Sequence, residues 1–92
     1  IWFGLARTDK GVSGYTVGMY QFGKDEIEVL DVQDKPSEIR DFIINMAGYV
    51  VSNDVTLRDG ETIGFSAKQK LPITRSAGVF TEGMTLKIGY GK

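Results

Sequence analysis

A single segment of the chain has the pattern of a helix. Pro36 suits the first helical turn, and Glu38 lies where a negative charge favours the helix dipole. Apolar residues then recur along one side at the spacing of helical turns. They are Ile39, Ile43, Met46 and Val50. The polar residues Ser52, Asn53 and Asp54 end the pattern, so we expect one long helix over residues 36–53 that packs by its apolar side.

The rest of the chain reads as short strands separated by turns. Glycine is frequent, with 12 among 92 residues, and it falls between segments that alternate apolar and polar positions. Asp59 with Gly60, and Glu82 with Gly83, are typical of tight hairpin turns. The expected strands and hairpins cover residues 1–8, 12–22, 27–32, 55–65 and 79–88. This predicts an α+β fold, with an antiparallel sheet of about five or six strands and the helix on one face.

Length and charge exclude several classes of protein. Residues 1–92 suffice for a single domain with one thin core. The net charge of -1 does not favour nucleic acid or anionic membrane as a partner. The chain begins at Ile1 instead of Met, and we expect it to be the C-terminal fragment of a longer chain.

The residue types present in the chain do not favour an enzyme. The chain has no cysteine and no histidine, so we expect no metal, no cofactor and no thiol or Ser–His–Asp catalysis. The spacing from Gly18 to Lys24 matches a phosphate-binding loop, but Asp25 follows where that loop needs Ser or Thr. No catalytic residue is predicted, although a site shared with an upstream region stays open as an alternative.

A basic segment at residues 66–76 is one candidate binding site. No acid occurs between Glu61 and Glu82, and cations alternate there with hydroxyl side chains on what reads as an extended connector. Cations and hydroxyls are what an oxyanion would need. The candidate ligand-binding residues are Lys68, Lys70, Thr74, Arg75 and Ser76.

A flat face of small residues is the second candidate site. If the helix covers one face of the sheet, the other needs a different cover, and an uncovered apolar patch marks an interface. The alternation in residues 1–22 suggests that a large aromatic shares this face with small residues. They are Trp2, Gly4, Ala6, Gly14, Thr16 and Gly18, of which Trp2, Gly14, Thr16 and Gly18 are the predicted interface.

Four stretches of the chain resemble a bacterial family of uncharacterised function. They are FGLARTDKGVSGYTVGM from Phe3, FGKDEIEVL from Phe22, DVTLRDGETIGFSAKQKLPITRS from Asp54 and GMTLKIGY from Gly83. The resemblance implies a domain of unknown function that forms the C-terminal part of a longer protein. It supplies no catalytic residues.

Two hypotheses about function follow. The leading one is a non-catalytic interaction module in the cytoplasm that packs on an upstream domain of the same polypeptide or forms a homo-oligomer. The alternative is a small-molecule or oxyanion-binding domain that uses the basic connector 66–76.

Overall fold

The structure is a computed structural model that describes residues 1–66 and 69–90. Its strands are β1 (Trp2–Thr8), β2 (Gly11–Val17), β3 (Glu26–Val32), β4 (Thr62–Ser66), β5 (Gln69–Ala77) and β6 (Met84–Ile88). A short 3-10 helix, η1 (Met19–Phe22), precedes β3, and the long helix α1 (Pro36–Ser52) follows it. The α+β class and the single long helix are therefore confirmed, and α1 ends one residue before the predicted boundary.

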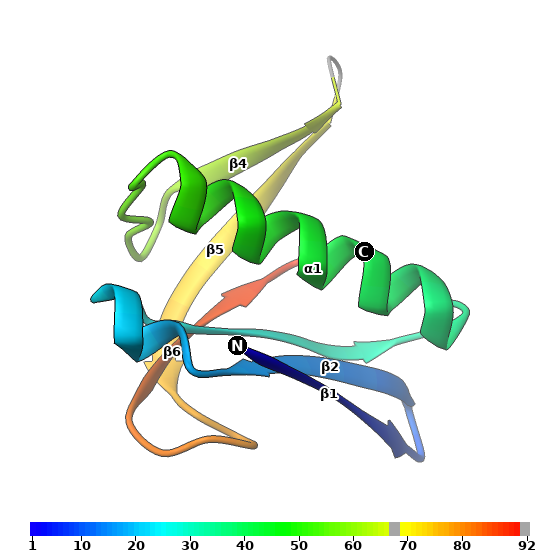
Figure 1. Ribbon diagram of the computed structural model, residues 1–92. Helices are drawn as coiled ribbons and strands as arrows, with labels where there is room; N and C mark the ends of the chain where they lie inside the picture. Colours follow the sequence, from blue (N-terminus) through cyan, green and yellow to red (C-terminus); the bar gives the residue numbers. More distant parts are fainter. Residues whose placement is uncertain (67–68, 91–92) are drawn as a thin grey trace.

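All six strands join one sheet in the order β1-β2-β3-β6-β5-β4 (Figure 1). Every neighbouring pair is antiparallel except β3 and β6, which run parallel with Ile27 beside Leu86. The sheet is therefore mixed and mostly antiparallel. The parallel pair joins two antiparallel parts, β1–β3 before α1 and β4–β6 after it.

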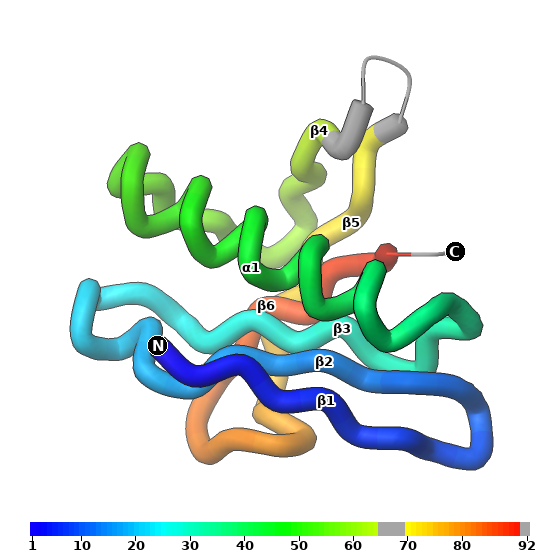
Figure 2. The backbone as a smooth tube through the Cα atoms, turned by 45° about the vertical axis from the view of Figure 1, so that its right-hand side comes forward, coloured from blue at the N-terminus to red at the C-terminus, as the bar shows by residue number. Residues whose placement is uncertain are grey.

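Helix α1 lies across one face of the sheet, over β1, β2 and β3 (Figure 2). Its apolar stripe meets the inward side chains of the strands to form the core. The core residues of α1 are Ile39, Phe42, Ile43, Met46, Ala47 and Val50. Gly14 of β2 lets the helix approach closely, because a Cβ there would lie 2.3 Å from Cδ1 of Ile43.

The second face of the sheet is covered in part by the loop between β5 and β6, residues 78–83. Figure 2 shows this loop on the side of the sheet away from α1. The ring of Phe80 stacks on Tyr15 with centroids 4.8 Å apart. Tyr15 in turn covers Gly4, where a Cβ would lie 2.2 Å from the ring. The aromatic pair therefore takes the place of a second layer over β1 and β2.

Four expected segments differ from the structure. Residues 79–81, expected as the first strand of a hairpin, lie in the loop 78–83 because β6 pairs with β5 instead. Residues 20–22 belong to η1 because Gly18 and Gly23 take positive φ values of 110° and 71°, which turn the chain out of β2. Residues 55–58 form no strand, and β4 pairs with β5 instead. The expected connector 66–76 is mostly strand β5, which hydrogen-bonds to β6 along Ile73–Ala77.

Candidate interaction surface

The residues predicted to share one interface lie on two faces. Trp2 pairs with Val17, and Leu5 pairs with Gly14, so even residues of β1 share a face with odd residues of β2. Gly14 therefore faces α1, whereas Trp2 faces the opposite side. The prediction of one flat face is wrong, because it placed even-numbered residues of both strands on the same face. In the observed register, each even-numbered residue of β1 pairs with an odd-numbered residue of β2.

Thr16 and Gly18 have structural roles beside a buried carboxylate. Thr16 is fully buried, and its hydroxyl donates to Oε1 of Glu26 at 2.9 Å. The N–H groups of Gly18 and Met19 donate to the same carboxylate at 3.0 Å. Glu26 therefore holds the turn into η1. Trp2 alone of the four predicted interface residues has a mostly exposed side chain.

Strand β1 is the most exposed apolar element in the described part of the chain. Trp2 is 80% exposed, and its neighbours Ile1, Phe3 and Leu5 are 42%, 39% and 43% exposed. β1 is also the end strand of the sheet, so its outer edge pairs with no strand in residues 1–66 and 69–90. An apolar strand with a free edge is a template for pairing with another chain.

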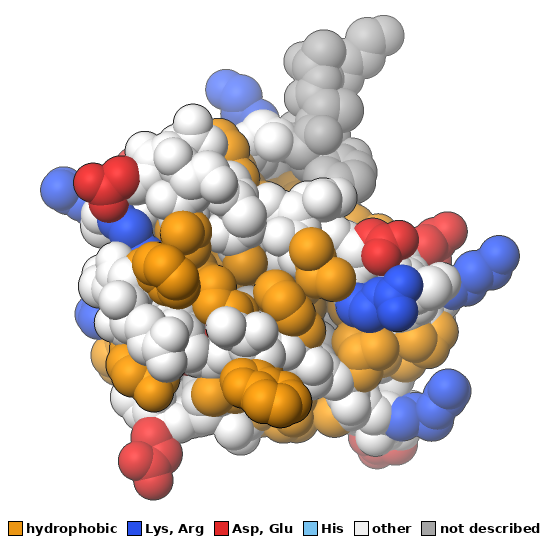
Figure 3. All heavy atoms as spheres, in the orientation of Figure 1, with side chains coloured by type: hydrophobic (Ala, Val, Ile, Leu, Met, Phe, Trp, Pro, Cys, Tyr) orange, Lys and Arg blue, Asp and Glu red, His pale blue; other side chains and the backbone are white. Residues whose placement is uncertain are grey.

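Sequence reasoning missed half of this surface. Phe3 and Leu5 lie on the face that carries α1, and Ile44 of that helix is also exposed. Figure 3, drawn in the orientation of Figure 1, shows hydrophobic side chains gathered on the side of the molecule where β1 and α1 face the viewer. The available signal was the run from Ile1 to Leu5, which is apolar at both parities. A thin domain with one helix cannot bury both faces of a strand at its edge.

The proposed oxyanion residues do not form one cluster. Lys68 lies outside the described residues. Lys70 and Thr74 are exposed on β5, and Ser76 is half-buried on the same face as Thr74. Strand alternation turns Arg75 to the opposite face.

Arg75 already has an acidic partner. Its Nε lies 2.7 Å from Oδ2 of Asp25, and this contact raises the pKa of the guanidinium. Its backbone N–H donates to Oδ1 of Asp59 at 2.7 Å. Arg75, which sequence analysis assigned to a ligand, therefore ties β5 to the segment before β3 through its side chain and to the loop before β4 through its backbone.

Glu28 is the most buried charged group that the structure describes, with an exposed fraction of 0%. Its carboxylate accepts hydrogen bonds from the N–H groups of Val79 and Phe80 at 3.0 and 2.8 Å. The hydroxyl of Thr85 donates at 2.9 Å, and Nζ of Lys87 lies 3.2 Å away. Burial raises the pKa of Glu28, but these donors outweigh it and leave the pKa below its usual value. The carboxylate is thus an anchor for the loop 78–83.

Two kinds of feature are absent from the residues that the structure describes. Within residues 1–66 and 69–90, no group of three Asp, Glu, His or Cys side chains is placed to hold a metal ion. No helix in that part of the chain has the length and apolar character required to cross a membrane.

One of three comparisons with known proteins supports the resemblance to a family of unknown function. The comparison with curated proteins gave no match, and neither did the comparison with solved structures. A family model described as a domain of unknown function, DUF4261, matches residues 15–89. That match begins within β2, runs past the end of β6 and covers most of the chain, so the protein belongs to the DUF4261 family.

Proposed function

We propose that this domain is a non-catalytic interaction module that pairs with a second copy of itself through the outer edge of β1. The single observation that carries the proposal is the exposure of β1: Trp2 is 80% exposed on an end strand. Monomeric proteins protect such edges with charge, proline or a bulge. β1 contains one charged residue, Arg7, and no proline, and its register with β2 is regular over all seven residues.

The pattern of side chains on β1 supports a second copy as the occupant. Two β1 strands can pair antiparallel about a two-fold axis at Gly4, which is an isologous contact. Trp2 of each copy then lies opposite Ala6 of the other, and Phe3 lies opposite Leu5. A large aromatic meets a small residue on one face, and two apolar side chains meet on the other. Exposed Trp side chains of this kind are frequent binding hot spots.

An upstream domain of the same polypeptide is the other occupant that the sequence suggested. It would cover the same edge without self-association of the 92-residue chain. We also propose a cytoplasmic location in a bacterial cell, which the absence of cysteine and the family resemblance support.

Sedimentation velocity over a range of protein concentrations tests the proposal. The chain is expected to associate to dimers, and Trp2→Lys is expected to remain monomeric at every concentration, because the charge would be desolvated at the contact. Tyr49→Gln is the matched control, since Tyr49 is 47% exposed on α1, away from β1. It is expected to associate like the unmodified chain.

Three results would contradict the proposal. A monomeric chain at millimolar concentration would refute pairing with a second copy. A monomeric chain that associates only when upstream sequence is added would assign the edge to that upstream domain. Equal association of Trp2→Lys and the unmodified chain would remove β1 from the contact altogether.

A further inference from the structure

A second apolar surface lies on the other side of α1 from β1. A groove of about 720 Å³ lies between the helix and β4, and Tyr90, which follows β6, also lines it. Ligand pockets in proteins commonly have volumes of this order, about 300–1,000 Å³. The groove is therefore large enough for a small organic molecule.

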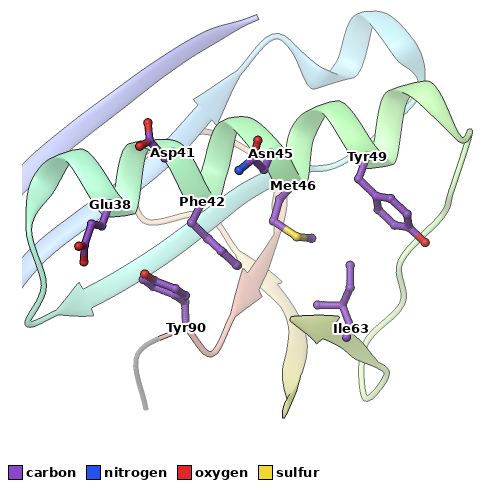
Figure 4. Close-up of a pocket in the computed structure, with 9 residues that line it drawn as sticks. Glu38, Asp41, Phe42, Asn45, Met46, Tyr49, Ile63 and Tyr90 are labelled. Carbon is purple, nitrogen blue, oxygen red and sulfur yellow. The ribbon is translucent and has the colours of Figure 1, made fainter. Parts of the chain in front are cut away.

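The floor of the groove is apolar and aromatic. Figure 4 shows Phe42, Met46 and Tyr49 extending from α1 toward Tyr90 and Ile63. The rings of Phe42 and Tyr90 stack with centroids 4.3 Å apart. The hydroxyl of Tyr90 donates to Oδ2 of Asp34 at 3.2 Å, which fixes the ring at the mouth of the groove. These contacts give a preformed surface against which a flat apolar group can pack.

The polar groups at the rim are acidic. Glu38 and Asp41 line the groove, and among residues 1–66 and 69–90 its lining contains no Lys or Arg. Asp34 stands beside Glu38, and the hydrogen bond between the two carboxyls lowers the pKa of Asp34 and raises that of Glu38. Arg40 approaches Asp41 at 3.5 Å, but both side chains are more than half exposed, so this pair is weak.

We propose that this groove binds a small organic amine, with its apolar body on Phe42, Met46 and Tyr90 and its ammonium group beside Glu38. The charge of the rim selects the cation, because two carboxylates, Glu38 and Asp41, line the groove. Lys35 acts on the Asp34–Glu38 pair, but it is exposed and lies outside this lining. The apolar floor selects the body, because burial of its surface provides the main driving force. This site is independent of the β1 contact, since the two lie on opposite sides of α1.

Titration of the ¹⁵N-labelled chain with tryptamine, followed by NMR, tests the proposal. Shifts are expected at the amides of Phe42, Met46, Ile63 and Gly64, while the amides of β1 stay in place. Indole-3-propionate has a similar apolar body and the opposite charge. We expect it to bind about fivefold more weakly than tryptamine, the factor expected for one exposed ionic contact.

Two variants block the groove by different means. Gly64→Val adds bulk at a position where a Cβ would meet no atom within 4 Å. Glu38→Lys replaces the carboxylate beside the ammonium group with a cation, at an exposed position of α1 where the substitution is expected to leave the fold intact. Both are expected to abolish the tryptamine shifts. Gly48→Ala changes the same helix outside the groove and is expected to bind tryptamine normally.

The proposal fails on any of three results. The first is that tryptamine does not shift the groove amides, and the second is that indole-3-propionate binds as tightly as tryptamine. The third is undiminished tryptamine binding by a folded Glu38→Lys chain. Because Glu38 is exposed, the Glu38→Lys chain is expected to fold, and it keeps the test decisive if Gly64→Val does not fold.

Discussion

Substitution of Glu28 tests most directly what fixes the loop 78–83 on the face of the sheet away from α1. The carboxylate sits at the centre of four donors from the loop 78–83 and β6. Glu28→Gln keeps the shape of the side chain but replaces one carboxylate oxygen with an NH₂ group. The replaced oxygen is the one that accepts a hydrogen bond from Thr85 and lies near Nζ of Lys87. Two backbone N–H groups lose a charged acceptor and keep at best a neutral one. The substitution should therefore loosen the loop that carries Phe80 onto Tyr15.

The magnitude follows from the number of bonds changed. A hydrogen bond to a charged group contributes about 1.5–3 kcal/mol, and a neutral one about 0.5–1.5 kcal/mol. Conversion of the two bonds from Val79 and Phe80 and disruption of the contact with Thr85 together give a loss of about 2–4 kcal/mol. Lys87 keeps acceptors in the carbonyls of Ser76 and Ala77, so it adds little.

Urea unfolding followed by far-UV circular dichroism measures this loss. Trp2 fluorescence is unsuitable, because the side chain is 80% exposed in the folded chain. Glu82→Gln is the matched control, since Glu82 lies on the same loop and is exposed, and it should change stability by less than about 0.5 kcal/mol. A loss at Glu28→Gln no larger than at Glu82→Gln would refute the anchoring role.

Three further predictions concern stability. Gly48→Ala should raise the free energy of unfolding by about 0.8–1 kcal/mol, because the helical site is open and alanine is the better helix former. Gly11→Ala should lower it by more than about 1 kcal/mol, since φ is +144° and the new Cβ would lie 2.4 Å from the carbonyl oxygen of Val32. Urea midpoints would check both, and equal midpoints for the two variants would contradict them. The pKa of Glu28 is lower in the folded chain than unfolded, so its contribution is full above the ordinary carboxyl pKa and is lost as pH falls through the folded value. The stability difference between the chain and Glu28→Gln should therefore shrink in acid, and a constant difference down to pH 2 would contradict the shift.

The helix was predictable because its signals are local. Pro36 and the stripe from Ile39 to Val50 are read within one segment, and tertiary packing confirms them. The parallel pairing of β3 with β6 was not predictable, because it joins Ile27 to Leu86 across most of the chain. Single-sequence patterns carry no information about which distant strands pair.

The candidate surfaces were also predictable only where the signal in the sequence is local. The exposure of Trp2 follows from a strand that is apolar on both faces. The parity of Gly14 depends on the register of the β1–β2 hairpin, which the turn decides. Arg75 looked free because its partner Asp25 lies 50 positions away in the sequence. The groove could not be foreseen, since Ile63 and Tyr90 reach α1 only through the fold of the second half.

Trp2 is the only tryptophan of the chain, so its fluorescence tests the central claim most directly. In dilute solution the indole is exposed, and its emission should resemble that of tryptophan in water. Pairing of β1 with a second copy removes the indole from water, so the emission should move to shorter wavelength as the protein concentration rises from micromolar to millimolar. Emission that stays water-like over the whole range, while circular dichroism shows a folded chain, would contradict pairing with a second copy through the β1 edge.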